Sequence, residues 1–122
     1  MKSLWRMTAD MPRFPTLEKD IRTDVLIIGA GITGILTAHF LKQRGIDYTL
    51  VEKGRLCELT TGNITAKVTF QHGLIYHKLL KDAGTEKAQM YLESGKQALE
   101  SYAELCKSIS CDFELKDNFV YS

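Results

Sequence analysis

The chain has 122 residues, of which 44% are hydrophobic and 25% are charged, an ordinary composition for a soluble globular protein. Its 16 lysines and arginines nearly balance its 15 aspartates and glutamates, so the net charge is only +1. This balance excludes the strongly basic surface that nucleic-acid binding requires, and we expect no nucleic-acid partner.

Cysteine content and hydropathy exclude further classes. Cys57, Cys106 and Cys111 are odd in number and show no C-x-x-C spacing, which favours reduced thiols, a cytoplasmic location and no metal site. Residues 25–41 lack charged side chains, but three glycines and a histidine interrupt them. We therefore expect no transmembrane segment, and the N-terminus does not show the pattern of a signal peptide.

Residues 1–20 show no hydrophobic periodicity, and two prolines punctuate them. They predict an extended N-terminal arm that is anchored on the body of the protein by its large apolar side chains. These anchors are Leu4, Trp5, Phe14 and Leu17.

The stretch from residue 24 to residue 52, DVLIIGAGITGILTAHFLKQRGIDYTLVE, organises the rest of the chain. Its apolar run at residues 25–28 predicts a strand buried on both faces of a parallel sheet. The next six residues fit G-x-G-x-x-G: Gly29 allows the tight turn, Gly31 the approach of a pyrophosphate, and Gly34 close packing of helix on strand. Backbone N–H groups at the start of the following helix, at Ile32 and Thr33, would face the phosphates.

A helix and a second strand complete this pattern. The helix carries Ile32, Ile35, Leu36 and Phe40 at roughly helical spacing, and Gly45 is placed for a left-handed C-terminal cap. A strand at residues 48–51 ends in Glu52, whose carboxylate would accept hydrogen bonds from an adenosine ribose and repel the 2′-phosphate of NADP. The stretch predicts an α/β, Rossmann-like βαβ unit that binds FAD or NAD. A βαβ unit without a ligand is the alternative.

The rest of the chain predicts shorter elements. Residues 53–63 read as a loop, and the alternation at residues 64–70 predicts a half-buried strand. Helices are predicted at residues 74–81 and 85–108, and a hairpin at residues 111–121. Two parallel strands are few for a dinucleotide-binding sheet, so we expect an incomplete N-terminal portion of a larger protein. The apolar stripe of the longer helix would comprise Met90, Leu92, Ala98, Leu99, Tyr102 and Leu105.

The glycine-rich turn, Glu52 and the segment TTGNITAKVTFQHGLIY (residues 60–76) together resemble the FAD-dependent oxidoreductases of the D-amino-acid-oxidase superfamily. That segment, the opening SLWRMTADMPRFPTLEKDIRTDVLIIGAGITG and the late CDFELKDNFVYS are most similar to the branch that carries a C-terminal Rieske iron–sulfur domain. The resemblance implies FAD rather than NAD, with any [2Fe-2S] cluster in a part of the protein not present here. It also implies a partial FAD-binding domain at residues 21–110 and the start of a β-rich substrate domain at residues 111–122.

The resemblance also implies roles for single residues. Thr60–Asn63 match the turn that, in the family, runs beneath the flavin and its phosphates. The following residues pass the isoalloxazine ring, where Lys67 would stabilise reduced flavin and His72 would line the substrate side. For each of these residues, ordinary turn chemistry, solvent exposure or structural packing is the alternative. The cofactor-binding set is Gly29, Gly31, Ile32, Thr33, Gly34, Glu52, Lys53, Arg55, Thr60, Thr61, Gly62, Asn63, Thr65, Ala66 and Lys67, with His72 and Lys67 as weak catalytic candidates.

The function expected from this resemblance is oxidation of a small-molecule amine or amino acid by hydride transfer to flavin N5. One alternative is an electron-transfer flavoprotein coupled to a Rieske centre; others are an NAD-binding module and a non-catalytic truncated module. The isolated chain is expected to be inactive alone and to self-associate through the uncovered parts of its sheet.

Overall fold

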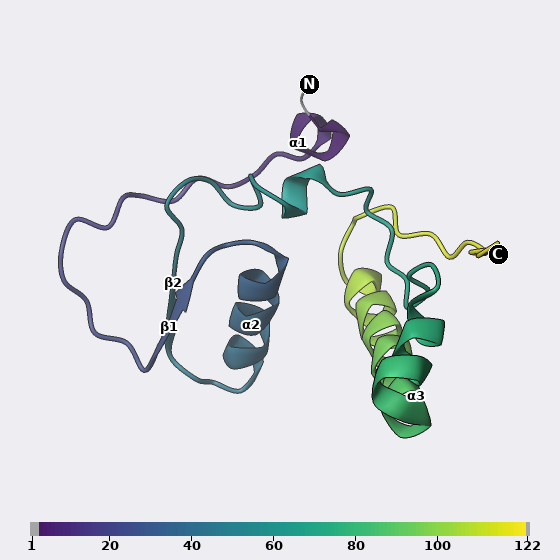
Figure 1. Cartoon of the computed structure of the whole chain (residues 1–122). Coiled ribbons are helices and arrows are strands. Elements are labelled where there is room, and N and C mark those ends of the chain that lie inside the picture. The colour runs from purple at the N-terminus through teal and green to yellow at the C-terminus, as the bar shows by residue number, and fades with distance from the viewer. Residues whose placement is uncertain (1–2, 122) are drawn as a thin grey trace. The chain divides into compact units, whose positions relative to one another are not determined.

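The computed structural model describes residues 3–121 and divides after Thr65 into two compact units (Figure 1). The first contains α1 (Leu4–Thr8), β1 (Val25–Ile28), α2 (Ile32–Gln43), β2 (Tyr48–Val51) and the short 3-10 helix η1 (Thr61–Asn63). The second contains the long helix α3 (Ile75–Lys107).

The centre of the first unit is the predicted βαβ arrangement. Strands β1 and β2 are parallel, with a register that runs from Val25 opposite Tyr48 to Ile28 opposite Val51. Helix α2 forms the crossover between them and packs on both strands. The prediction of a strand, a glycine-rich turn, a helix and a second strand is confirmed.

Helix α2 ends at the predicted glycine cap. Gly45 has φ +67°, its N–H donates to the Lys42 carbonyl at 3.1 Å, and the Ile46 N–H donates to the Leu41 carbonyl at 3.0 Å. These two bonds satisfy carbonyls at the helix end and turn the chain back toward β2.

The buried face of α2 is formed mainly by small residues. Ile32, Ile35 and Phe40 are all more than a third exposed, whereas Ala38 is 8% exposed and Gly34 is half-buried. Of the four large apolar residues at helical spacing, only Leu36 is half-buried. Small residues four apart, Gly34 and Ala38, instead allow the helix backbone to lie close to the sheet.

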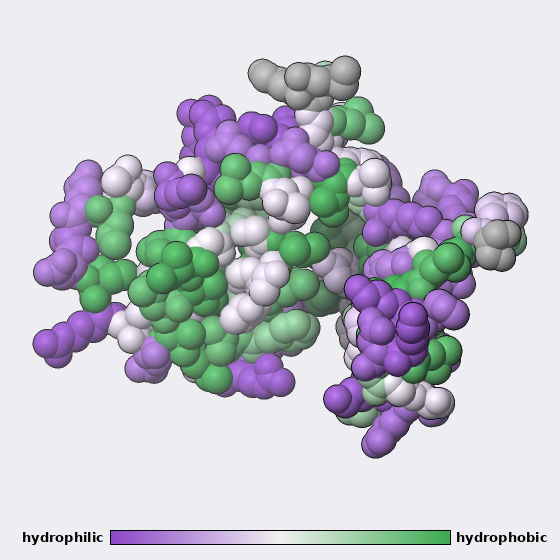
Figure 2. All heavy atoms as spheres, in the orientation of Figure 1, coloured by the Kyte–Doolittle hydropathy of each residue, from purple (hydrophilic) through white to green (hydrophobic). Residues whose placement is uncertain are grey.

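Strand β1 is buried on one face, not on two as predicted. Ile27 is 8% exposed, but Leu26 is 55% and Ile28 is 81% exposed. Within residues 3–65, α2 packs against the face that carries Ile27. On the opposite face Leu26 and Ile28 are exposed, and their β2 partners Thr49 and Val51 are half-buried. Figure 2 shows hydrophobic side chains gathered over this sheet and α2.

Residues 3–20 are not extended throughout, because the predicted arm contains the five-residue helix α1. A helix this short is unstable alone, so its contacts with the rest of the unit must maintain it. Trp5 provides such an anchor, as predicted, by donating its indole N–H to the Ile64 carbonyl. The other three predicted anchors, Leu4, Phe14 and Leu17, are 59%, 71% and 57% exposed.

Helix α3 corresponds to the two predicted helices. Gly84 interrupts it with non-helical dihedral angles (φ 84°, ψ 170°), close to the predicted boundary. The longer part carries a stripe of buried and half-buried residues at spacings of three and four: Ala88, Leu92, Gly95, Leu99 and Tyr102. Met90 and Ala98, which were predicted to belong to this stripe, are exposed.

The strand predicted at residues 64–70 and the hairpin predicted at residues 111–121 are both absent from these described segments. Ala66 and Asp112 have φ values of +54° and +48°, which interrupt an extended path. Phe70 packs against helix α3: a Cβ added at Gly95 would lie 2.7 Å from the Phe70 Cβ. Side-chain alternation was therefore misleading because the segment packs on a helix rather than pairing with a strand. None of the helices described in residues 3–121 has the length and apolarity needed to cross a membrane.

Candidate cofactor-binding site

The glycine-rich turn joins β1 to α2 at the carboxyl end of the two strands. Gly29 has φ +102°, a conformation that favours glycine, and its N–H donates to the Val51 carbonyl at 2.8 Å. A Cβ added at Gly34 would lie 2.0 Å from the Gly29 carbonyl oxygen, so no side chain fits there. The first and third glycines therefore set the path of the turn and the approach of the helix to it, as the sequence predicted.

The start of α2 offers backbone N–H groups to an anion. The N–H groups of the first helical turn lack acceptors within the helix, and the helix dipole gives this end a partial positive charge. The Ile32 N–H donates to the Thr61 hydroxyl oxygen at 2.9 Å. A Cβ added at Gly31 would lie 3.3 Å from the same oxygen. Since the Thr61 oxygen accepts here, its own hydrogen is directed elsewhere and can be donated to a phosphate.

Glu52 lies directly after β2, where its carboxylate holds two backbone segments. Oε2 accepts the Ala30 N–H at 2.8 Å and Oε1 accepts the Gly54 N–H at 2.9 Å. These bonds, led by the one from Ala30, lower the pKa of the Glu52 carboxyl below its ordinary value, so it is ionised at neutral pH. Each oxygen retains a further lone pair for a ribose hydroxyl, and the half-buried carboxylate fits that role.

The loop after β2 folds back onto the glycine-rich turn. The Cys57 N–H donates to the Ala30 carbonyl at 3.0 Å, and burial raises the pKa of the Cys57 thiol. The Asn63 amide donates to the carbonyls of Glu58 at 3.2 Å and Leu59 at 2.6 Å, closing the loop on itself. This places η1, and Thr61 with it, at the N-terminus of α2.

The structure brings most of the predicted cofactor residues of the first unit to this edge of the sheet. Gly29, Gly31, Ile32, Thr33 and Gly34 form the turn and the helix start, with Glu52 and Thr61 beside them. Gly62 is buried, while Lys53, Arg55, Thr60, Asn63 and Thr65 are exposed around the loop.

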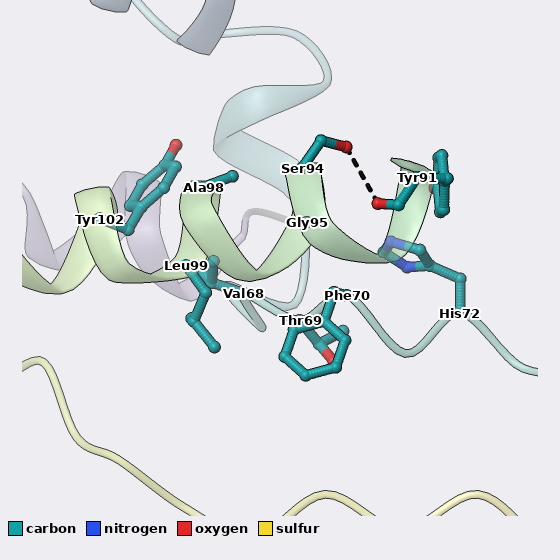
Figure 3. A pocket seen from close by; sticks show the side chains of 10 residues that line it. All are labelled: Val68, Thr69, Phe70, His72, Tyr91, Ser94, Gly95, Ala98, Leu99 and Tyr102. Atoms are coloured by element: carbon teal, nitrogen blue, oxygen red, sulfur yellow. Dashed lines mark hydrogen bonds between the residues drawn. The ribbon is translucent and has the colours of Figure 1, made fainter. Parts of the chain in front are cut away.

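Three predicted residues belong to the second unit. Ala66 is exposed, and the Lys67 ammonium donates to the Asn118 side-chain oxygen. Asn118 also donates to Thr69 at 3.1 Å and to Gln71 at 2.8 Å. His72 lies at one end of a cavity of about 250 Å³ between α3 and residues 68–72, with its ring edge-to-face with Tyr91 (Figure 3). Lys67 and His72 do not contact each other in this arrangement.

Sequence reasoning missed several residues that shape the site. Ala30 acts through its backbone N–H and carbonyl, which leave no side-chain signal in a motif. Cys57 has φ +53° and bonds to Ala30, although it had been considered only as a thiol. Trp5 and Arg6 reach the same loop from α1, more than fifty residues away in sequence.

The fold and this site define the first unit as a βαβ unit of the dinucleotide-binding class. The chain belongs to the DAO family of FAD-dependent oxidoreductases, whose family model matches residues 24–122. Membership of this family indicates FAD as the dinucleotide and confirms the resemblance drawn from the sequence.

Two curated relatives are similar to this chain. YhfW of Bacillus subtilis, named as a candidate Rieske 2Fe-2S iron-sulfur protein, is 36% identical over 99% of this chain and 24% of its own length. Subunit A1 of the anaerobic glycerol-3-phosphate dehydrogenase of Haloferax volcanii is 48% identical over 43% of this chain and 8% of its own length. The chain thus spans about a quarter of YhfW, and no solved structure matches it.

Proposed function

We propose that this chain is the FAD-binding N-terminal segment of an oxidoreductase that oxidises an amine or an amino acid. Bound FAD would supply the hydride acceptor, at flavin N5. The residues described here bind and orient that cofactor. The family match over residues 24–122 supports FAD as the cofactor, because a glycine-rich turn alone would serve NAD equally well. The amine or amino-acid substrate rests on the resemblance of residues 60–76.

Each part of the site contributes a separate interaction with FAD. The Ile32 N–H donates to Thr61, so the other N–H groups of the first turn of α2 and the Thr61 hydroxyl bind the pyrophosphate at the positive end of the helix dipole. Glu52 binds the ribose hydroxyls of the adenosine. Lys53 and Arg55 are exposed cations within three residues of Glu52 and would border the adenosine or the phosphates.

The roles nearer the flavin ring rest on the family resemblance. Thr60, Gly62 and Asn63 would form the turn beneath the flavin, and Thr65 and Ala66 would continue along the ring. Lys67 would stabilise the negative charge of reduced flavin, and His72 would line the substrate side. The cavity beside His72 lies wholly in the second unit, and its lining is largely apolar and aromatic, with Phe70 and Tyr91 among the residues.

A second candidate function is electron transfer to a Rieske iron–sulfur centre. The 36% identity to YhfW across nearly the whole chain favours it. None of the three cysteines of this sequence lies in the C-x-H or C-x-x-H patterns that ligate a Rieske cluster. Any such cluster would have to be held by residues outside this sequence.

The visible spectrum of the protein purified at its natural length tests FAD binding directly. Flavin absorbs at about 450 nm, whereas bound NAD does not. Anaerobic addition of amines and amino acids, with glycerol 3-phosphate as the alternative substrate, should bleach this band only for the amine class. Bleaching by glycerol 3-phosphate alone would refute the amine assignment, and a colourless protein that does not take up added FAD would refute the cofactor assignment.

A pair of variants tests the ribose assignment. Glu52→Arg removes the acceptors and adds a cation at a strand end, so FAD affinity should fall by on the order of a hundredfold. Lys67→Ala should lower that affinity far less, because Lys67 would face the flavin ring and leave the adenosine contact intact. The measurement is FAD titration of the deflavinated proteins at equal ionic strength, with circular dichroism to verify the fold. An unchanged affinity in Glu52→Arg would contradict the assignment.

A further inference from the structure

Helix α1 is bonded to the loop that contains the candidate phosphate-binding residues. The Trp5 indole N–H donates to the Ile64 carbonyl at 2.7 Å, just after η1. The Arg6 guanidinium pairs with the Glu58 carboxylate at 2.8 Å, just before η1. The two contacts bracket residues 58–64, so α1 spans the loop from one end to the other.

The stem of Arg6 also covers the buried glycine of this loop. A Cβ added at Gly62 would lie 2.2 Å from the Cys57 carbonyl oxygen and 3.2 Å from the Arg6 Cγ. Gly62 is therefore enclosed between the loop backbone and the methylene groups of Arg6. This packing buries Gly62 although Trp5 itself remains 40% exposed.

The loop held in this way reaches the cofactor site through one residue. Thr61 lies between the two contacts from α1 and accepts the Ile32 N–H at the start of α2. A shift of the loop would move the Thr61 hydroxyl away from this N–H. The position of Thr61 thus depends on contacts made by residues that do not themselves reach the glycine-rich turn.

We propose that Trp5 and Arg6 are positioning residues that hold residues 58–64 in the conformation competent to bind the FAD pyrophosphate. This inference rests on the proposed FAD-binding function. If the loop leaves this conformation part of the time, the apparent dissociation constant rises in inverse proportion to the competent fraction. Each contact shifts that balance modestly, because one is a single neutral hydrogen bond and the other is a partly exposed ion pair.

The test is FAD titration of the deflavinated protein at its natural length, in variants that remove the contacts and keep the bulk. Trp5→Phe removes the indole donor, and Arg6→Met removes the charge while retaining an apolar stem over Gly62. The double variant should bind FAD about tenfold more weakly than wild type. Met7→Ala, at a 67% exposed position on the same helix, is the matched control and should bind as wild type does.

Two further measurements separate positioning from general stability. Amide hydrogen exchange of residues 57–64 in the FAD-free protein should be faster in the double variant, while exchange in β1 and β2 stays at the wild-type rate. The single variant Arg6→Glu should lose FAD affinity. The double variant Arg6→Glu with Glu58→Arg, which reverses the ion pair, should regain most of that affinity.

The outcomes distinguish this inference from the proposed function. If wild-type protein does not bind FAD, the proposed function fails and the inference fails with it. If wild type binds FAD but the double variant binds equally well, or if exchange in residues 57–64 is unchanged, the inference alone is overturned. Equal acceleration of exchange in β1 and β2 would also overturn it, since α1 would then stabilise the whole unit rather than the loop.

Discussion

Substitution of Gly34 by alanine tests the packing of α2 on the glycine-rich turn. The added Cβ would lie 2.0 Å from the Gly29 carbonyl oxygen and 3.4 Å from the Ile27 Cγ2. A carbon and a carbonyl oxygen ordinarily stay about 3.3 Å apart, so the helix or the turn must shift by roughly 1.3 Å. The Gly29 oxygen belongs to the backbone and the position of a Cβ is fixed by the helix backbone, so rotamer changes cannot relieve the shorter contact. Overpacking of this kind costs about 1–3 kcal/mol, occasionally more.

The shift has a second consequence, because it displaces the N–H groups at the start of α2 from the strand end where Glu52 lies. Gly34→Ala should therefore lower both the free energy of unfolding, by about 2 kcal/mol, and the affinity for FAD, by roughly tenfold or more. Urea denaturation and FAD titration measure the two effects. Gly45→Ala is the control. Position 45 has φ +67° and open space around it, so alanine adds backbone strain of about 1–2 kcal/mol without a clash. The FAD affinity of this variant should be unchanged. Wild-type stability and affinity in Gly34→Ala would refute the packing argument.

Three further outcomes are expected. The pKa of Glu52 is lower in the folded than in the unfolded protein, so ionised Glu52 should stabilise the fold. This stabilisation should be fully present above the ordinary pKa of about 4.5 and be lost as the pH falls through the pKa of the folded protein. Glu52→Gln should remove this part of the pH dependence of the free energy of unfolding. The 122-residue chain should self-associate through the open face of its sheet, and Ile28→Lys should reduce the light-scattering mass, whereas a wild-type monomer at all concentrations would contradict this. Iodoacetamide near neutral pH should modify exposed Cys111 before half-buried Cys57, whose pKa is raised, as peptide mass spectrometry would show; the reverse order would be the contrary result.

The sequence predicted the parts of the first unit that depend on local chain chemistry. Gly29 and Gly45 adopt the positive φ angles expected of a tight turn and a helix cap. Gly34 has the close backbone contact expected of the third glycine, and Glu52 lies at the end of β2 facing the turn. The conformations of the three glycines are fixed by the residues themselves and their near neighbours. Glu52 is placed over a longer range, 22 residues from Ala30, but by the regular course of a βαβ unit that the motif already indicates.

Predictions failed where a residue's surroundings come from distant parts of the chain. The apolar run of β1 indicated two covered faces, yet only the face toward α2 is covered in residues 3–65, and Leu26 and Ile28 are exposed. The alternation at residues 64–70 indicated a strand, but a strand needs a partner, and Phe70 packs against Gly95 instead. The link from Trp5 to Ile64 joins positions 59 residues apart, and no local pattern could have signalled it.

The connectivity of the βαβ arrangement bears on the order in which the protein folds. Every pairing between β1 and β2 joins residues 23 positions apart, as Val25 and Tyr48 show, and the bond from Ala30 to Glu52 spans 22. Loops of this length close at low entropic cost, since the cost rises only with the logarithm of length. The helix that fills the loop is itself a local structure that forms within about a microsecond. The glycine-rich turn should therefore form early, before the contacts between α1 and residues 58–64 are made. In the first unit, α1 comes first in the sequence but should be the last helix to dock.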